Sequence, residues 1–278
     1  MRSRFVSVSL AFLATLLLSS GAFAQIYGPS TEGHRSPQAT KAAAAAPKPA
    51  YDPHDLSGVW WGRGNSILMG NPWPNFTDNG RKLFQMNKPS FGPTAVLPAL
   101  GNDPQGNCDP LGYPRNIYAN GRSFELVMTP KKIWQIFEWS RANREIWLDG
   151  RQIPEDADPR WYGYSVGHWD GDKLIVHSAD YRGDTWLDQA GDPHDENMTI
   201  DEVFTHPDSE TLTDLMTLTD PTVYVAPLVP WQPQKFQLQE PKGVTELAED
   251  YCVPSEEESF NQNTRNRAAG TAVPVEVK

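Results

Sequence analysis

Three side chains suited to proton transfer lie close together in the chain: Tyr164, His168 and His177. The pair Asp170-Gly171, between two runs of strand-forming residues, predicts a β-hairpin with a two-residue type I′ turn. In that register Tyr164 pairs with His177, and one face of the hairpin carries Tyr162, Tyr164, His168, Ile175 and His177. Imidazole is a general base near neutral pH, and a phenol beside it donates to a developing oxyanion. The face predicts acid/base catalysis if it points into a cavity; if it points to solvent, the rings only satisfy each other.

The opposite face of this hairpin is lined largely by small residues. It carries Gly163, Ser165, Gly167, Trp169, Leu174, Val176 and Ser178. The small residues leave room for a bulky neighbouring side chain or for a ligand.

Acidic residues on expected strands form a second candidate group: Asp149, Glu202 and Asp220, with Arg144 and Arg151 as counter-ions. A carboxylate that points into a protein interior is costly unless it is paired or used. Glu202 is therefore a fourth candidate catalytic residue, and Arg144 and Asp149 are candidate ligand contacts. The alternative is a set of surface salt bridges, because Glu202 alternates with Phe204 and His206 on a face that could be either side.

Aromatic residues supply the remaining candidate contacts to a ligand. The chain has 10 Trp and 9 Tyr, and a cavity lined by such rings binds planar apolar molecules and sugar faces. Trp161, Trp186 and Tyr162 are the expected lining residues, since they flank turn-rich segments. Core packing accounts for most of the other rings.

Metal and cofactor chemistry have little support in the sequence. His168, His177 and His194 do not have ligand spacing, and no H-E-x-x-H, C-x-x-C or acidic Ca²⁺ loop occurs. Gly163-Tyr-Ser165-Val-Gly167 matches the hydrolase G-x-S-x-G pattern, but it precedes a hairpin turn rather than a helix. No phosphate loop or dinucleotide fingerprint is present, so we expect no metal and no cofactor.

The elements that position these residues are predicted to be strands. Apolar residues alternate with a period near two from Ser123 onward, and Asp-Gly pairs, Ser140–Asn143 and Pro207-Asp208-Ser209 make turns. Eight or nine strands joined by short turns predict an all-β fold, an antiparallel up-and-down, lipocalin-like barrel, with a two-sheet β-sandwich as the alternative. One short helix is expected after Asp78.

The ends of the chain indicate export. Arg2 and Arg4, an apolar run and Ala22-Phe23-Ala24 predict a signal peptide over residues 1–24. Residues 25–54 are expected to be a disordered linker, residues 55–260 a single β domain, and residues 261–278 a disordered tail. The protein is therefore expected to be periplasmic or secreted, with no transmembrane segment after the leader.

Charge and cysteine content agree with that location. Cleavage removes two arginines and no acidic residue, which leaves 22 basic and 35 acidic residues and a formal charge of −13. Nucleic acid is therefore not an expected partner. The two cysteines, Cys108 and Cys252, are expected to form a disulfide in an oxidising compartment, the alternatives being free thiols or half of a metal site.

Several segments resemble known proteins. Gly58-Val59-Trp60 is similar to the Gly-x-Trp motif of lipocalin-like barrels, where the Trp on the first strand plugs one end. Together with Asp55–Trp60, the segments Leu148–Arg151, Gly163–Val176 and Asp220-Pro221 with Tyr224 resemble a family of secreted bacterial proteins. The resemblance covers most of residues 55–252 and implies an exported β-rich domain without implying a reaction. Tyr164 stands where that family often has His, and His177 where it often has Asp, so no shared role is carried to those two positions.

These patterns predict a barrel that binds a small apolar, aromatic or sugar-like molecule. The alternative is a cofactor-free isomerase, lyase or hydrolase that uses Tyr164, His168 and His177 inside the barrel. A third hypothesis is a structural protein of the cell envelope, which would need an exposed apolar patch and no cavity. The sequence leaves the oligomeric state open.

Overall fold

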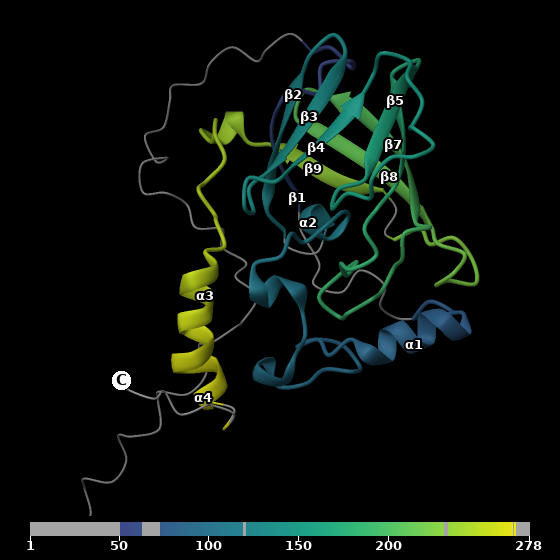
Figure 1. Cartoon of the computed structure of the whole chain (residues 1–278). Helices are drawn as coiled ribbons and strands as arrows, with labels where there is room; N and C mark the ends of the chain where they lie inside the picture. Colours follow the sequence, from purple (N-terminus) through teal and green to yellow (C-terminus); the bar gives the residue numbers. More distant parts are fainter. Residues whose placement is uncertain (1–50, 63–72, 119–120, 231–232, 269, 271–278) are drawn as a thin grey trace, which may run out of the picture. The chain divides into compact units, whose positions relative to one another are not determined.

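Nine strands form a closed barrel in a computed structural model of the chain (Figure 1). The structure describes residues 51–62, 73–118, 121–230, 233–268 and 270. The expected signal peptide and most of the expected linker lie outside these residues. The expected all-β barrel is confirmed, with strands at β1 Gly58–Gly62, β2 Ser123–Met128, β3 Lys132–Phe137, β4 Asn143–Trp147, β5 Tyr164–Asp170, β6 Lys173–Ala179, β7 Thr199–Asp208, β8 Thr211–Thr219 and β9 Gln234–Leu238.

The strands follow one another around the barrel in sequence order, and β9 pairs with β1 to close it. Closure gives every barrel strand two neighbours, which removes the free edges of an open sheet. Eight of the nine pairs are antiparallel, and β4 and β5 are parallel. An odd number of strands requires this departure from the expected up-and-down pattern, since directions that alternate around a closed ring need an even number. The segment 148–163 therefore crosses over between β4 and β5, as a parallel connection must.

The hairpin of β5 and β6 turns one residue later than the sequence predicted. Its two-residue loop is Gly171-Asp172, because Asp170 still pairs with Lys173. Gly171 has a positive φ of 56°, whereas Asp172 does not, which is the pattern of a type II′ turn. Each residue of β5 therefore pairs two positions further along β6 than expected. A shift of two keeps every side chain on its predicted face.

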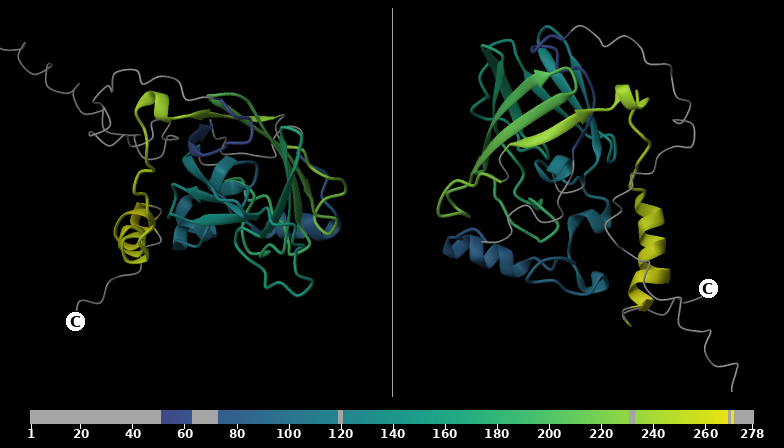
Figure 2. Two further views of the ribbon diagram at one scale, coloured as in Figure 1. Left: turned by 90° about the horizontal axis from the view of Figure 1, so that it is seen from above. Right: turned by 180° about the vertical axis from the view of Figure 1, so that it is seen from behind.

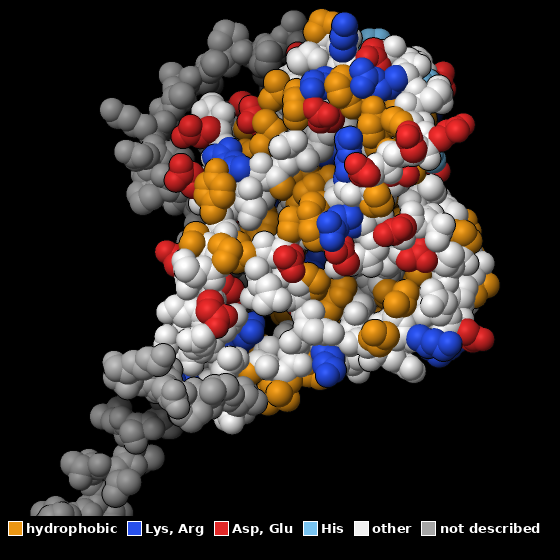
Figure 3. All heavy atoms as spheres, viewed as in Figure 1, with side chains coloured by type: hydrophobic (Ala, Val, Ile, Leu, Met, Phe, Trp, Pro, Cys, Tyr) orange, Lys and Arg blue, Asp and Glu red, His pale blue; other side chains and the backbone are white. Residues whose placement is uncertain are grey.

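Alternation along the strands divides the barrel into an apolar inside and a polar outside. Trp60 on β1 is fully buried, and its indole N–H donates to Leu56 O at 2.9 Å. It packs with inward-facing side chains from all around the barrel, among them Phe124, Phe137, Leu174, Val176, Phe204, Met216 and Phe236. On the outer face, a cation lies over aromatic rings. Lys132 lies 3.8 Å from the ring centre of Trp134 and 4.6 Å from that of Trp147, and apolar and basic side chains intermingle on the face seen in Figure 3.

The long segment between β1 and β2 contains helix α1 (Asp78–Met86), short turns η2 (Pro98–Leu100) and η3 (Pro104–Asn107), and α2 (Arg115–Tyr118). Helix α1 was expected from the sequence. Its N-cap is Thr77, whose hydroxyl accepts from Gly80 N at 3.0 Å. We call residues 111–118, which include α2, the plug. Every residue of the plug is buried, and Tyr113, Ile117 and Tyr118 belong to the barrel core. In Figures 1 and 2 the plug lies at one end of the barrel.

The folded region extends beyond both boundaries predicted from the sequence. Tyr51 was expected in the linker, but its ring lies 5.2 Å from the ring of His206 and its hydroxyl donates to His206 O. After η4 (Glu240–Lys242), the C-terminal segment forms α3 (Pro254–Phe260), the π-helical turn η5 (Asn261–Arg265) and α4 (Asn266–Ala268). Asn261, expected in the tail, is buried and donates to Gly106 O at 3.3 Å.

The expected disulfide between Cys108 and Cys252 is confirmed. It joins the segment just before the plug to the segment just before α3, across a sequence separation of 144. Among the described residues, no helix is both long and apolar enough to cross a bilayer.

Candidate functional site: a polar cluster inside the barrel

The Tyr and His side chains singled out from the sequence lie on the outer face of β5 and β6. His168 and His177 are exposed, and His177 Nδ1 lies 2.7 Å from Asp201 Oδ1 on β7. Tyr164 pairs with Ala179, not His177, and is covered by the side chains of Arg151 and Arg160. The expectation of a Tyr/His cluster inside the barrel is therefore wrong. Tyr164, His168, Ile175 and His177 share one face as predicted, but that face points outward. Tyr162, predicted on the same face, precedes β5 and is buried in the barrel core.

The inward face of β5 and β6 leaves space that Arg144 occupies. Ser165 and Ser178 are both fully buried, and their hydroxyls accept from Arg144 Nε at 2.8 Å and from Nη2 at 2.7 Å. Ser178 also donates to Ser165 at 2.8 Å. The small residues noted in the sequence thus make room for a bulky neighbour, which is the guanidinium of β4.

Arg144 pairs with Glu202 of β7 in the barrel interior. The two side chains have 0% exposure and form two parallel contacts, Nη1 to Oε1 at 3.1 Å and Nη2 to Oε2. Burial opposes the charge on Arg144, but the neighbouring carboxylate outweighs it and raises the pKa of the guanidinium. The sequence singled out both residues but left open which way Glu202 points; the structure places it inside the barrel, paired with Arg144, one of the two counter-ions considered.

A second carboxyl group, Asp214 of β8, lies beside Glu202. It is 1% exposed, and Tyr118 of the plug donates to its Oδ2. Burial and the charge of Glu202 raise the pKa of Asp214 well above its usual range.

Two tyrosines of the plug complete the group. Tyr113 donates its hydroxyl proton to Glu202, and Tyr118 donates to Asp214. Burial and the neighbouring carboxyl groups raise the pKa of both phenols well above the usual value, so both remain donors. We call the whole group the interior cluster: Tyr113, Tyr118, Gln135, Arg144, Ser165, Ser178, Glu202 and Asp214.

Two buried polar atoms around Phe137 have no hydrogen-bond partner. Gln135 Oε1 accepts from Arg144 at 3.4 Å, but Gln135 Nε2 is unpaired, and Gln135 shares the inward face of β3 with Phe137. Asn116 of the plug donates from Nδ2 to Tyr162 at 3.1 Å, while its Oδ1 is unpaired. Tyr162 stacks on Phe137 with ring centres 5.3 Å apart. Unpaired buried donors and acceptors are uncommon in folded proteins and require an explanation, such as a water or a ligand.

The other residues predicted from the sequence to contact a ligand are dispersed. Asp149 accepts from Arg151 Nε at 2.8 Å on the outer side of the crossover segment. Trp161 lies under Arg182, with 4.0 Å between the guanidinium carbon and the ring centre. Trp186 is buried, 5.7 Å from the guanidinium carbon of Arg115. Of this set, Arg144 belongs to the interior cluster, and Tyr162 accepts a hydrogen bond from Asn116 of the plug.

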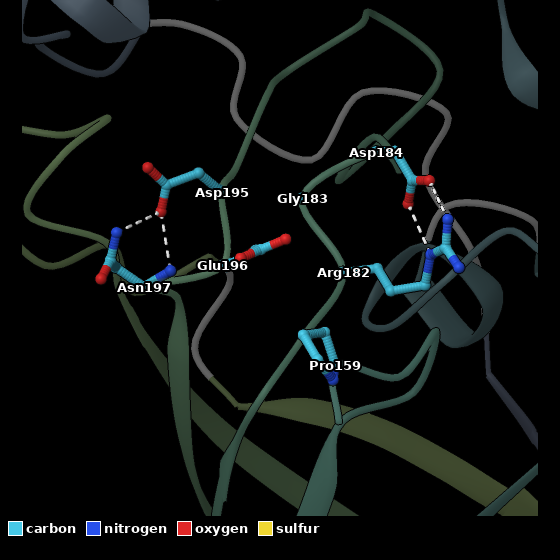
Figure 4. A pocket seen from close by; sticks show the side chains of 7 residues that line it. All are labelled: Pro159, Arg182, Gly183, Asp184, Asp195, Glu196 and Asn197. Atoms are coloured by element: carbon cyan, nitrogen blue, oxygen red, sulfur yellow. Dashed lines mark hydrogen bonds and ion pairs between the residues drawn. The ribbon is translucent and has the colours of Figure 1, made fainter. Parts of the chain in front are cut away.

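An open surface cleft of about 620 Å³ lies near Trp161 but apart from the interior cluster (Figure 4). Its walls are two segments that approach closely at Gly183, where a Cβ atom would lie 3.1 Å from Asp195 Cα. Asp184 is paired with Arg182, and Asp195 accepts from Asn197, while Glu196 points between the walls. The cleft is lined by Pro159, Arg182, Gly183, Asp184, Asp195, Glu196 and Asn197. Its acidic side chains are mostly held by neighbours, so the cleft offers few free groups to a ligand.

Sequence reasoning missed Tyr113, Tyr118 and Asp214. Asp214 had a usable signal, because alternation places it on one face with Leu212, Met216 and Leu218. The tyrosines had none, since they lie in a segment without periodicity. In the described part of the chain, no group of three or more His, Cys, Asp or Glu side chains is arranged to hold a metal ion.

The fold and the cluster define a class of protein, a closed β-barrel with a charged and hydrogen-bonded interior. Comparisons add no closer relationship: no family profile, curated protein or solved structure matches this chain.

Proposed function

We propose that this protein binds a small organic molecule inside its barrel, at the interior cluster. The observation that carries the proposal is the pair of unpaired buried atoms, Asn116 Oδ1 and Gln135 Nε2. One is an acceptor and the other a donor. Gln135 shares the inward face of β3 with Phe137, and Asn116 bonds to Tyr162, whose ring stacks on Phe137. A planar molecule with polar substituents supplies what these atoms lack, since ligand sites combine apolar walls with a few placed polar groups.

Binding agrees better with the cluster than catalysis by Glu202 does. Both oxygens of Glu202 accept from Arg144, and one also accepts from Tyr113. These contacts engage both oxygens, so Glu202 serves to hold Arg144 and Tyr113 in place.

A second candidate function, a cofactor-free acid/base enzyme, is favoured by Asp214 alone. A carboxylic acid kept neutral near pH 7 by a buried site can donate a hydrogen bond or a proton to a substrate. Burial and the charge of Glu202 raise the pKa of Asp214 in that direction. In this alternative Asp214 is the acid, and the exposed His168 and His177 take no part.

We further propose that the protein acts outside the cytoplasm, in the periplasm or after secretion. The signal-peptide pattern of residues 1–24 supports this location. The disulfide between Cys108 and Cys252 also agrees with it, because disulfides persist in oxidising compartments.

The test is native mass spectrometry of the purified mature protein, followed by calorimetric titration with the molecule that it retains. We expect Gln135→Leu to weaken binding about tenfold or more, since an acceptor of the bound ligand loses its donor, Gln135 Nε2, and is buried without a partner. His168→Ala is the matched control and should leave the affinity within about threefold, because an exposed side chain on the outer face makes no contact with the interior.

Two outcomes would contradict this proposal. If Gln135→Leu binds as well as the wild type, the ligand does not lie at the interior cluster. If turnover of a substrate is found and follows a His titration that His168→Ala abolishes, the outer Tyr/His face is the functional one after all.

A further inference from the structure

The plug places two phenol groups on the two carboxyl groups of the barrel. Tyr113 lies with its ring centre 4.2 Å from the guanidinium carbon of Arg144 and 6.3 Å from the ring of Phe137, and its hydroxyl donates to Glu202. The barrel interior thus provides an aromatic wall, a cation over the ring and an acceptor for the hydroxyl. These are the features of a site for a phenol.

The second phenol, that of Tyr118, makes a similar contact with β8, the strand next to β7. Its hydroxyl donates to Asp214, and its ring lies 6.3 Å from that of Phe236 in an edge-to-face contact. Both tyrosines come from a segment that lies outside the sheet, so neither ring is held by the hydrogen-bond ladder of the barrel.

Stability alone does not explain these groups. Replacing a buried ion pair by apolar side chains of similar volume is often neutral or stabilising. A barrel of this size could have been filled by Leu and Ile around Trp60. Instead it buries an arginine, two carboxyl groups and two phenols, and leaves Gln135 and Asn116 with unpaired atoms.

The charge of the cluster restricts which molecules fit. Arg144 and Glu202 neutralise each other, and Asp214 adds a second buried carboxyl group on the neighbouring strand. A carboxylate would bring an uncompensated negative charge next to Glu202, which is costly in a desolvated site. A neutral hydroxyl adds a donor without adding charge.

We propose that the ligand of the interior cluster is a neutral hydroxyaryl compound, and that Tyr113 occupies its place in the free protein. This inference rests on the proposed function. When the ligand binds, its hydroxyl donates to Glu202, its ring lies between Arg144 and Phe137, and the plug withdraws Tyr113. A second oxygen on the ring would accept from Gln135 Nε2. Tyr113 thus competes with the ligand for Glu202 and donates a hydrogen bond to it while no ligand is bound.

The experiment compares three probes that share the 4-methylphenyl ring on the mature, disulfide-bonded protein: p-cresol, which is the analogue of the tyrosine side chain, 4-methylanisole and 4-methylbenzoate. We expect calorimetry to show p-cresol binding about tenfold or more tightly than 4-methylanisole, which has no hydroxyl proton to donate, and no measurable binding of 4-methylbenzoate. Saturation with p-cresol should also increase amide hydrogen exchange in the plug.

Removing the internal competitor gives the sharper test. Tyr113→Phe keeps the ring but deletes the hydroxyl that competes for Glu202, so we expect it to bind p-cresol about tenfold more tightly than the wild type. Tyr224→Phe is the matched control, because Tyr224 is also buried but donates to Pro193 O at 2.7 Å, away from the cluster. It should leave the affinity for p-cresol unchanged.

The outcomes separate this inference from the proposed function. Equal affinity for p-cresol and 4-methylanisole in the wild type, or unchanged affinity in Tyr113→Phe, overturns the hydroxyaryl ligand. The proposed function still stands in that case if the retained molecule is lost in Gln135→Leu. If the wild type neither retains a molecule nor binds any of the three probes, both proposals fail. The wild-type comparison does not depend on whether Tyr113→Phe folds.

Discussion

Arg144 is charged inside the barrel, and its contribution to the stability of the fold depends on its contact with Glu202. Arg144→Met removes the cation but leaves Glu202 buried. We expect a loss of about 3–5 kcal/mol in the free energy of unfolding, because breaking a buried pair leaves an uncompensated charge. Urea denaturation of the variant and the wild type measures the difference.

The exposed pair of Asp149 and Arg151 is the control for this substitution. Its side chains are 24% and 37% exposed, and Asp149→Asn should cost less than about 1 kcal/mol. The double variant Arg144→Met/Glu202→Gln should be more stable than Arg144→Met alone. If it is not, the loss of stability in Arg144→Met comes from lost packing and not from the unpaired carboxylate of Glu202.

Asp214 predicts how stability depends on pH. Its pKa is raised in the folded protein by burial and by Glu202, and the pKa in the unfolded chain is about 3.9. Above that value the folded state holds a proton that the unfolded state has lost, so rising pH favours unfolding until the raised pKa is passed. The stabilising effect of protonated Asp214 is thus complete below about pH 4 and is lost as the pH rises.

Asp214→Asn should remove this dependence, because the amide is a neutral donor at every pH. We expect the stability of the wild type, relative to the variant, to fall between about pH 5 and about pH 8 by at most about 1.4 kcal/mol per pH unit. Chemical denaturation at these two pH values measures it, and Asp156→Asn, at an exposed carboxylate, serves as control. A difference between wild type and Asp214→Asn that does not change with pH would show that Asp214 is ionised in the folded protein.

At this scale the sequence singled out Glu202 and Arg144 but not their arrangement. Both were charged residues on expected strands, and alternation alone left open whether Glu202 faces the core or the solvent. The hairpin face was assigned inward because it carries chemically active side chains, whereas the apolar and small residues of the other face decide burial. Ser165 and Ser178 point inward because Arg144 needs the space and the hydroxyls. Tyr113 and Tyr118 could not be found, since no period in residues 111–118 says where the segment packs.

At the scale of elements, strands were predictable and connections were not. Every barrel strand was anticipated within a few residues, because period-two alternation reports local environment. A closed ring of nine strands needs one parallel pair, which here is β4 with β5. The sequence suggested eight or nine strands, so it could not decide whether a parallel pair was needed. The plug and the segments beyond the expected boundaries depend on long-range contacts, such as that of Tyr51 with His206.

Helix α1 offers a test in which local propensity and packing predict opposite results. Ala is favoured over Gly inside a helix by about 1 kcal/mol, so Gly80→Ala would stabilise an isolated α1. A Cβ atom at Gly80 would lie 2.1 Å from Val223 O, however, and the backbone must shift to admit it. We therefore expect Gly80→Ala to lower the free energy of unfolding by about 1–3 kcal/mol.

Gln85 is the matched position, because it lies in the same helix and is exposed. Gln85→Ala should change stability by no more than about 0.5 kcal/mol. Thermal denaturation followed by circular dichroism compares both variants with the wild type. A Gly80→Ala protein as stable as Gln85→Ala would mean that α1 does not pack against the Val223 segment in solution.

At the scale of the whole molecule, the disulfide joins parts that the barrel ladder does not connect. Cys108 precedes the plug and Cys252 precedes α3, and 144 positions separate them in sequence. A cross-link over so long a loop restricts the unfolded chain strongly, and the chain-entropy model gives an upper figure of about 5 kcal/mol. The same bond anchors the segment that carries Tyr113.

The double variant Cys108→Ser/Cys252→Ser should lose up to about 5 kcal/mol of unfolding free energy, and amide exchange in the plug should increase more than exchange in β7 and β8. Because β7 and β8 are held by the closed ladder, they should stay protected until the whole barrel unfolds. Treating the wild type with dithiothreitol should reproduce the variant, while the variant itself should not respond. If stability is unchanged by both treatments, the bond adds nothing to the fold. If the plug and the barrel strands lose protection together, the plug is an inseparable part of the barrel core and cannot withdraw to admit a ligand.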